Sequence, residues 1–124
     1  AAIAAIMSDP AHSAEVKSMV DTFKTRRDLM LSLMADIPGL RTNIPQGAFY
    51  IFPDVTEYYG KTTGDLIINN GTDLCNYLLD YAHIALVSGE AFGNPDCIRI
   101  SYATSNEALI EAGQRMKKAL GELK

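Results

Sequence analysis

The sequence lacks several features that would point to a particular class of protein. It has no tryptophan, two cysteines and two histidines among 124 residues. Neither Cys75 nor Cys97 lies in a C-x-x-C motif, so no zinc site is predicted, and both are expected to be free thiols of a cytoplasmic protein. Neither His12 nor His83 has a serine, cysteine or carboxylate at a motif spacing, so the sequence offers no nucleophile–base pair.

A surplus of basic residues and long apolar runs are absent as well. Eleven basic and fifteen acidic residues give a net charge of −4. Binding of nucleic acid needs a basic face, so nucleic acid is not an expected partner. The longest wholly apolar run, residues 1–7, is too short to span a membrane and lacks the basic start of a signal peptide, so no membrane association is expected.

What is present is the composition of a folded domain. Apolar residues make up 48% and charged residues 21%, close to the average of globular proteins. The length suits one hydrophobic core, so we expect a single domain over residues 1–124. Residues 1–9 follow a helical Ala/Ile pattern without an initiator methionine. They are expected to be the tail of a preceding helix, in a chain cut from a longer one.

Three segments have helical periodicity. The first is expected over residues 9–36, with an Asp-Pro start and a Pro38-Gly39 stop. A second helix is expected over residues 74–81. A third is expected after Thr104, which forms a T-x-x-E capping box with Glu107. The inward face of the first helix is expected to carry the residues spaced by three or four, namely Val16, Met19, Val20, Phe23, Arg27, Met30, Met34 and Ile37.

Short segments rich in β-branched and aromatic residues predict four strands, at residues 40–44, 48–52, 84–87 and 98–102. The first two are expected to form a hairpin across their short Pro/Gly link. Residues 55–68 are expected to be mostly loop, with one candidate helical turn near the end. Because three amphipathic helices can cover one face of such a sheet, the expected fold is α+β. It is a two-layer sandwich with a mostly antiparallel sheet of about four short strands and three helices on one face.

Arg99 is the most informative side chain, because it lies inside the predicted strand 98–102. Strand side chains alternate, so the two isoleucines and Tyr102 share one face, and Arg99 and Ser101 share the other. If the isoleucines meet the helices, Arg99 points to the uncovered face. A guanidinium on a rigid strand can bind a carboxylate through two parallel hydrogen bonds. The residues alone leave an ordinary solvated arginine as the alternative.

The loop of residues 88–93 precedes this strand and has the sequence S-G-E-A-F-G. Its two glycines permit backbone angles that other residues rarely adopt. Phe92 is the only bulky residue in this loop. Its position leaves two alternatives open, in which the ring either covers a site or packs into the core.

Several segments, taken in order, resemble class I aminotransferases, the pyridoxal-phosphate enzymes of fold type I. Residues 44–53, I-P-Q-G-A-F-Y-I-F-P, are similar to the P-x-G-A-F-Y segment of that family. Residues 87–93, V-S-G-E-A-F-G, and residues 98–103, I-R-I-S-Y-A, are similar to its V-P-G-x-x-F-G and R-I-S-x-A patterns. Residues 26–28, R-R-D, and 37–40, I-P-G-L, fit its R-R-D and P-G spacing.

The resemblance implies that residues 1–124 are the C-terminal small domain of an aspartate-aminotransferase-like enzyme. It implies that Arg99 binds the α-carboxylate of the substrate, and that Phe49 lies near the site entrance as a second substrate-binding residue. It also implies that the small domain moves onto a large domain when substrate binds. Ser88 stands where the family usually has proline, which could loosen the loop.

The resemblance also implies partners outside this chain. The parent protein is expected to be a homodimer that uses pyridoxal 5′-phosphate and acts on amino-acid and 2-oxo-acid substrates. In the family the Schiff-base lysine and the cofactor-binding residues belong to the large domain, upstream. None of the six lysines here has a matching context. The resemblance therefore gives this chain no catalytic residue, cofactor-binding residue or metal ligand, and the fragment alone is expected to be inactive.

Two other kinds of protein stay open at this point. The chain could be a stand-alone α+β small-molecule-binding or regulatory module without catalysis, since such domains share this order of helices and strands. It could also be a structural dimerisation domain. An upstream reading frame that encodes a lysine-bearing, cofactor-binding domain would favour the transaminase.

Overall fold

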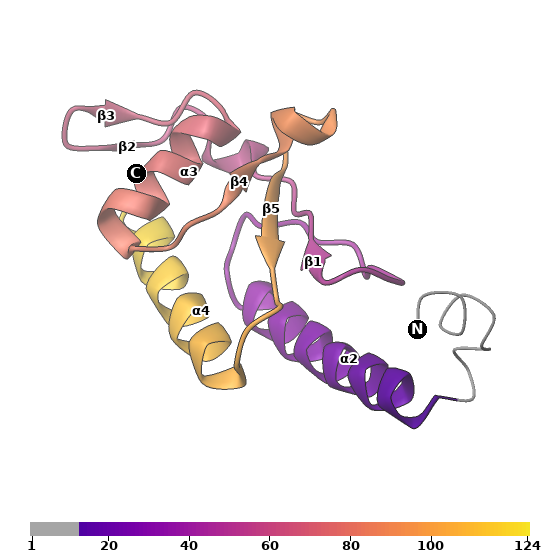
Figure 1. Cartoon of the computed structure of the whole chain (residues 1–124). Helices are drawn as coiled ribbons and strands as arrows, with labels where there is room; N and C mark the ends of the chain where they lie inside the picture. Colours follow the sequence, from indigo (N-terminus) through magenta and orange to yellow (C-terminus); the bar gives the residue numbers. More distant parts are fainter. Residues whose placement is uncertain (1–12) are drawn as a thin grey trace.

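The computed structural model describes residues 13–124 (Figure 1), so the helix tail expected over residues 1–9 lies outside the described residues. Three helices, five short strands and two 3₁₀ turns follow one another in these residues. In order they are α2 (Ala14–Ala35), β1 (Tyr50–Ile51), η2 (Thr56–Tyr58), β2 (Thr62–Thr63), β3 (Leu66–Ile67), α3 (Gly71–Ala82), β4 (Val87–Ser88), η3 (Gly89–Phe92), β5 (Ile98–Ser101) and α4 (Asn106–Gly121).

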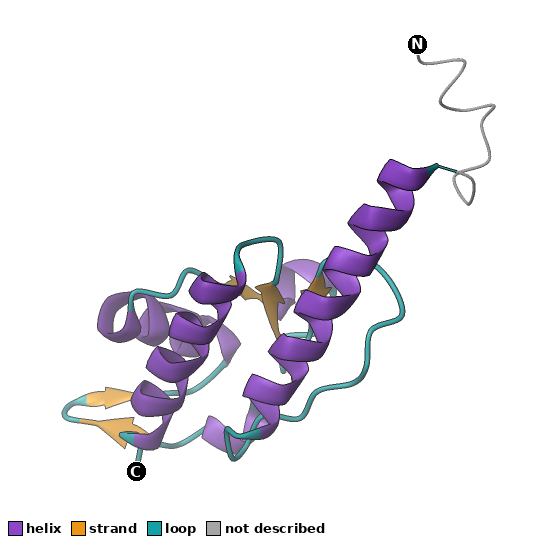
Figure 2. Ribbon diagram, turned by 90° about the horizontal axis from the view of Figure 1, so that it is seen from below, coloured by secondary structure: helices purple, strands orange, loops and turns teal. Residues whose placement is uncertain are grey.

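The main sheet is antiparallel and has three strands in the order β1–β5–β4, so β5 is central. Tyr50 pairs with Ser101 on one side of β5, and Val87 pairs with Arg99 on the other. Helices α2 and α4 pack along each other, and α3 packs against α4 and β4 (Figures 1 and 2). The predicted α+β fold, with a small antiparallel sheet covered by three helices, is confirmed.

Burial along β5 alternates as predicted. Ile98 and Ile100 are buried, whereas Arg99 is half-buried and Ser101 is exposed. The isoleucines belong to a core that all three helices and β1 share. Its fully buried members include Met30, Met34, Ile51, Leu74, Leu78, Leu109 and Met116. Arg99 and Ser101 therefore lie on the face of the sheet that the helices do not cover.

A serine caps two of the helices. Ser13 has an extended backbone, and its hydroxyl accepts the amide hydrogen three residues further on at 3.3 Å, so α2 begins at Ala14. The Asp-Pro start predicted at residues 9 and 10 lies outside the described residues. The hydroxyl of Ser105 caps α4 in the same way at 3.2 Å. The cap predicted at Thr104 is therefore wrong by one residue. Ser and Thr are both favoured N-cap residues, so the sequence does not show which of these two neighbours caps the helix. The backbone conformation of Ser105 identifies it as the cap.

The strand predictions were less accurate. Residues 40–44 form no strand, and the expected hairpin with residues 48–52 does not form. Arg41 makes an isolated antiparallel bridge with Asp54, beyond that segment. Strand β1 instead pairs with β5, because this pairing buries Ile51 against the core. The predicted strand 84–87 is shifted to β4, because Ile84 still belongs to the C-terminal cap of α3. Its backbone amide donates a hydrogen bond to the Leu78 carbonyl oxygen at 3.1 Å.

Residues 55–68 contain more structure than predicted. The candidate helical turn at 65–68 is wrong, because β3 occupies this position and pairs with β2 in a tight hairpin. Gly64 in the turn has a φ of 56°, a backbone angle that glycine adopts without strain. Strands of two residues carry no periodicity, so this hairpin gave no signal in the sequence.

The first half of α2 extends away from the rest of the described chain (Figures 1 and 2). Met19 and Val20 are 53% and 54% exposed, although their spacing placed them on the predicted inward face. Only Met30 and Met34 of this helix are fully buried. The helical period was correct, but residues 13–124 supply no element that covers the first turns. Within those residues no helix is both long and apolar enough to cross a membrane.

Candidate functional site

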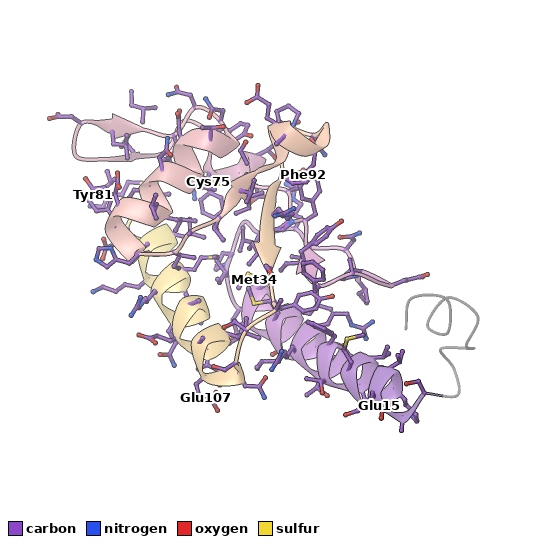
Figure 3. The ribbon with its side chains drawn as sticks, viewed as in Figure 1. Glu15, Met34, Cys75, Tyr81, Phe92 and Glu107 are labelled. Atoms are coloured by element: carbon purple, nitrogen blue, oxygen red, sulfur yellow. The ribbon has the colours of Figure 1, made fainter. Side chains whose placement is uncertain are left out.

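The guanidinium of Arg99 lies between two aromatic rings on the uncovered face of the sheet. Its central carbon is 5.4 Å from the ring centre of Tyr50 and 4.5 Å from that of Phe92. These distances are within the range of cation–π attraction. Strand β5 carries the arginine, β1 carries the tyrosine, and η3 carries the phenylalanine, which Figure 3 shows beside the start of β5.

The register of the sheet places Tyr50 beside Arg99. Tyr50 is opposite Ser101, and residues opposite each other in an antiparallel pair point to the same face. Two hydrogen bonds extend this pairing by one residue. The Phe49 carbonyl oxygen accepts one from the Tyr102 amide at 2.8 Å and one from the Ser101 hydroxyl at 3.4 Å. Tyr50 therefore shares the face of Arg99 as a consequence of strand pairing.

Phe92 lies over Arg99 and does not enter the core, which decides between the two alternatives that the sequence left open. Its side chain is 49% exposed and meets Phe52 edge-on at a centroid distance of 6.3 Å. The turn that carries it begins at Gly89, where a Cβ would overlap the carbonyl oxygens of Asn94 and Cys97. Only glycine permits this close approach of the backbone.

Phe49, the second predicted site residue, packs against Tyr50 and is not one of the two rings over Arg99. Its ring is edge-on to Tyr50 at 6.0 Å and tilted against Phe23 of α2 at 6.2 Å. Half of the side chain is exposed. Arg99 and Phe49 are thus neighbours of one tyrosine, and the Phe49 ring also borders the extended half of α2.

Arg99 has no carboxylate partner within the described residues, a property that it shares with Arg26 of α2, which lies over the Phe23 ring. Arg27, Arg41 and Arg115 each form an ion pair with a carboxylate. No acidic side chain within residues 13–124 forms an ion pair with Arg99. A guanidinium on a rigid strand, with apolar rings on two sides and no internal counter-ion, is suited to bind an external carboxylate.

No other group in the described residues offers catalytic chemistry. Burial raises the pKa of the Cys75 thiol to about 11, so this free cysteine stays protonated near neutral pH and is a poor nucleophile. His83 is exposed and ends α3 in the left-handed conformation. Over residues 13–124 there is no cluster of three or more potential metal ligands.

Tyr50 is the residue of this site that sequence reasoning missed. Alternation along residues 48–52 places Tyr50 and Phe52 on one face and Ile51 on the other, and this signal was available. What the sequence could not reveal was the strand that pairs with this segment. The pairing with β5 brings Tyr50 to Arg99.

This small α+β domain, with one partly buried arginine on its open face, corresponds to a known class of protein. Residues 1–115 match the model of the family described as Aminotransferase class I and II. The chain belongs to this family. The match includes both strands and the turn that build the candidate site.

Particular relatives are aspartate aminotransferases by name. The chain is 46% identical to a "Bifunctional aspartate aminotransferase and glutamate/aspartate-prephenate aminotransferase" of Petunia hybrida, over 100% of this chain and 26% of the relative. It is 43% identical to an "Aspartate aminotransferase" of Pinus pinaster, over 97% of this chain and 25% of that one. The crystal structure of the Rhizobium meliloti aspartate aminotransferase superimposes with a TM-score of 0.89 at 38% identity, over 99% of this chain and 30% of that one. The chain thus spans about a quarter of the length of these curated relatives.

Proposed function

We propose that this chain is the C-terminal small domain of an amino-acid transaminase of the aspartate type, in which Arg99 binds the substrate α-carboxylate. The observation that carries the proposal is the position of the guanidinium on the central strand, between Tyr50 and Phe92 and without a carboxylate partner in residues 13–124. The names of the relatives support the substrate class.

The proposed role follows from the chemistry of the guanidinium. Its planar fork donates two parallel hydrogen bonds to a carboxylate, which fixes both position and orientation. The two rings restrict the rotation of the Arg99 side chain and limit its contact with water, so less conformational entropy is lost when a carboxylate binds. A bound α-carboxylate held in this way would orient the adjacent α C–H bond toward the reacting group.

We propose that residues 13–124 do not form a site for pyridoxal phosphate by themselves. In the described residues Arg99 is the only cation over the Tyr50 and Phe92 rings. Lys17 and Lys117 pair with carboxylates of α2 and of its C-terminal cap, and Lys61 lies over the ring of Tyr58. We therefore propose that the cofactor-binding residues and the Schiff-base lysine belong to the remainder of the full-length protein.

The isolated 124-residue chain is accordingly expected to show no saturable, stoichiometric absorbance change when it is titrated with pyridoxal phosphate. Exposed lysines will react weakly and without saturation, as they do in any protein. The measurement is a spectrophotometric titration, with the full-length protein as the positive control. A stoichiometric band in the isolated chain would show that one of its own lysines binds the cofactor.

We also propose that the domain takes part in closure of the active site and that the parent is a homodimer. The support is a set of large apolar side chains that residues 13–124 leave uncovered. They include Met19 and Val20 on α2, Phe49, and Phe92 over Arg99, each about half exposed. Such a surface is typical of a contact with another domain or subunit. A cytoplasmic location of the parent stays a prediction.

Aspartate is expected to be the preferred amino donor of the full-length protein. A transamination assay with a panel of amino acids and 2-oxoglutarate measures this as kcat/KM. The acidic donors should exceed alanine and phenylalanine by at least about tenfold, because a site built for a second carboxylate rejects donors that lack it. A higher kcat/KM for an aromatic or small apolar donor would contradict the aspartate assignment and leave the role of Arg99 unchanged.

A further inference from the structure

The turn that carries Phe92 is connected to helix α3 by two hydroxyl groups. The Thr72 hydroxyl, in the first turn of α3, donates to the Ser88 hydroxyl at 3.0 Å. The Ser88 hydroxyl also accepts the amide of Glu90 at 3.4 Å, and so caps η3. Ser88 therefore joins the start of η3 to a helix that is packed into the core.

We infer that the Thr72–Ser88 hydroxyl pair positions Phe92 over Arg99. The inference rests on the proposed carboxylate-binding role of Arg99. Without the Ser88 hydroxyl, η3 loses its N-terminal cap and its side-chain link to α3. Phe92 then moves more freely, and the guanidinium loses the closer of its two rings.

The backbone conformation at residue 88 is one that proline can adopt. Ser88 has φ −60° and ψ 139°, and proline fixes φ near −65°. The Gly89 amide donates a hydrogen bond to the Cys97 carbonyl oxygen at 2.8 Å. In an antiparallel pair of strands, successive residues alternate between those whose amides bond to the partner strand and those whose amides point away from it. The Ser88 amide therefore points away from β5, and a proline at this position removes no ladder bond. Either the hydrogen bonds of the Ser88 hydroxyl or a proline ring at position 88 can therefore restrict the start of η3 to one conformation.

Close backbone packing fixes the position of the α3 N-terminus, which carries Thr72. Gly71 begins α3, and a Cβ there would lie 2.9 Å from the carbonyl oxygen of Pro95 and 3.2 Å from that of Cys97. The Asn70 side chain caps the helix by accepting the amide of Asp73 at 2.8 Å. The first turn of α3, including Thr72, is thereby held against the loop that leads into β5.

The test is a set of variants of the full-length protein assayed with aspartate and 2-oxoglutarate. Ser88→Ala is expected to raise the KM for aspartate about two- to fivefold, the effect of one partly exposed hydrogen bond, with kcat within about twofold of the parent value. Thr72→Val should have the same effect, and the double variant no more than either single one. Ser88→Pro should restore the KM, and Thr72→Val should have no effect in the Ser88→Pro background.

Thermal unfolding of each variant separates positioning from stability. A purely structural role would lower the melting temperature of Ser88→Ala without the split between KM and kcat, and that result would overturn the inference. Failure of Ser88→Pro to restore the KM would also overturn it. Arg99→Ala is assayed in parallel. If it raises the KM while Ser88→Ala and Thr72→Val do not, only this inference fails, whereas an unchanged KM in Arg99→Ala overturns the proposed function as well.

Discussion

Replacement of Arg99 by alanine in the full-length protein is expected to raise the KM for the amino-acid donor by roughly 30-fold or more. Loss of one partner of a desolvated, bidentate charge pair costs about 2–5 kcal/mol of binding free energy. The side chain is half-buried between two rings, so water would solvate the unpaired substrate carboxylate poorly in its place. Steady-state kinetics with both the amino-acid and the 2-oxo-acid substrate provide the measurement.

Two control variants make this result specific. Arg99→Lys keeps the charge but loses the planar fork, so its KM should lie between those of the parent and Arg99→Ala. Arg115→Ala removes an arginine of α4 that pairs with Glu111, and its KM should stay within about twofold of the parent, because a surface ion pair contributes little. The absorbance of bound cofactor should be the same in all three variants. A parent-like KM in Arg99→Ala would refute the assignment.

Replacement of Gly89 by alanine is expected to have the second largest effect, because it acts on both stability and the site. The added Cβ would overlap the carbonyl oxygens of Asn94 and Cys97, which are backbone atoms and cannot rotate away. Overpacking of this kind costs about 1–3 kcal/mol of the free energy of unfolding. Relief of the overlap must displace η3, and Phe92 moves with it.

The measurement for Gly89→Ala is denaturant unfolding of the isolated chain, together with the KM of the full-length variant. Gly47→Ala is the matched control, since no atom lies within 4 Å of a Cβ at that position and its backbone φ is not positive. The control should leave the free energy of unfolding within about 0.5 kcal/mol of the parent value. Equal stability of the two glycine variants would mean that the close contact at Gly89 relaxes without cost.

The elements that were predicted well have long periodic patterns. Helices α3 and α4 and the middle of α2 were expected from apolar spacing alone. The alternation along β5 correctly placed Arg99 opposite the isoleucines. These successes depend on local geometry, because a side chain's direction follows from the helical or strand repeat.

The elements that were predicted poorly depend on contacts distant in the sequence. The hairpin proposed between residues 40–44 and 48–52 failed because β1 is stabilised by β5, about fifty residues further along the chain. The hairpin of β2 and β3 was missed because strands of two residues contain no repeat. Met19 and Val20 followed the helical repeat and yet lie exposed, since burial depends on a partner element as well as on the repeat.

The sequence by itself determined the α+β fold class, and its motifs pointed to the aminotransferase family and to Arg99. Only the tertiary structure decided that Tyr50 and Phe92 are the neighbours of this arginine, and that Ser88 holds the turn through Thr72. The physical reason is that a motif specifies which residue is present and which way it faces. Its neighbours are determined by strand pairing and by close backbone contacts such as that of Gly71 with Pro95, which join segments far apart in the chain.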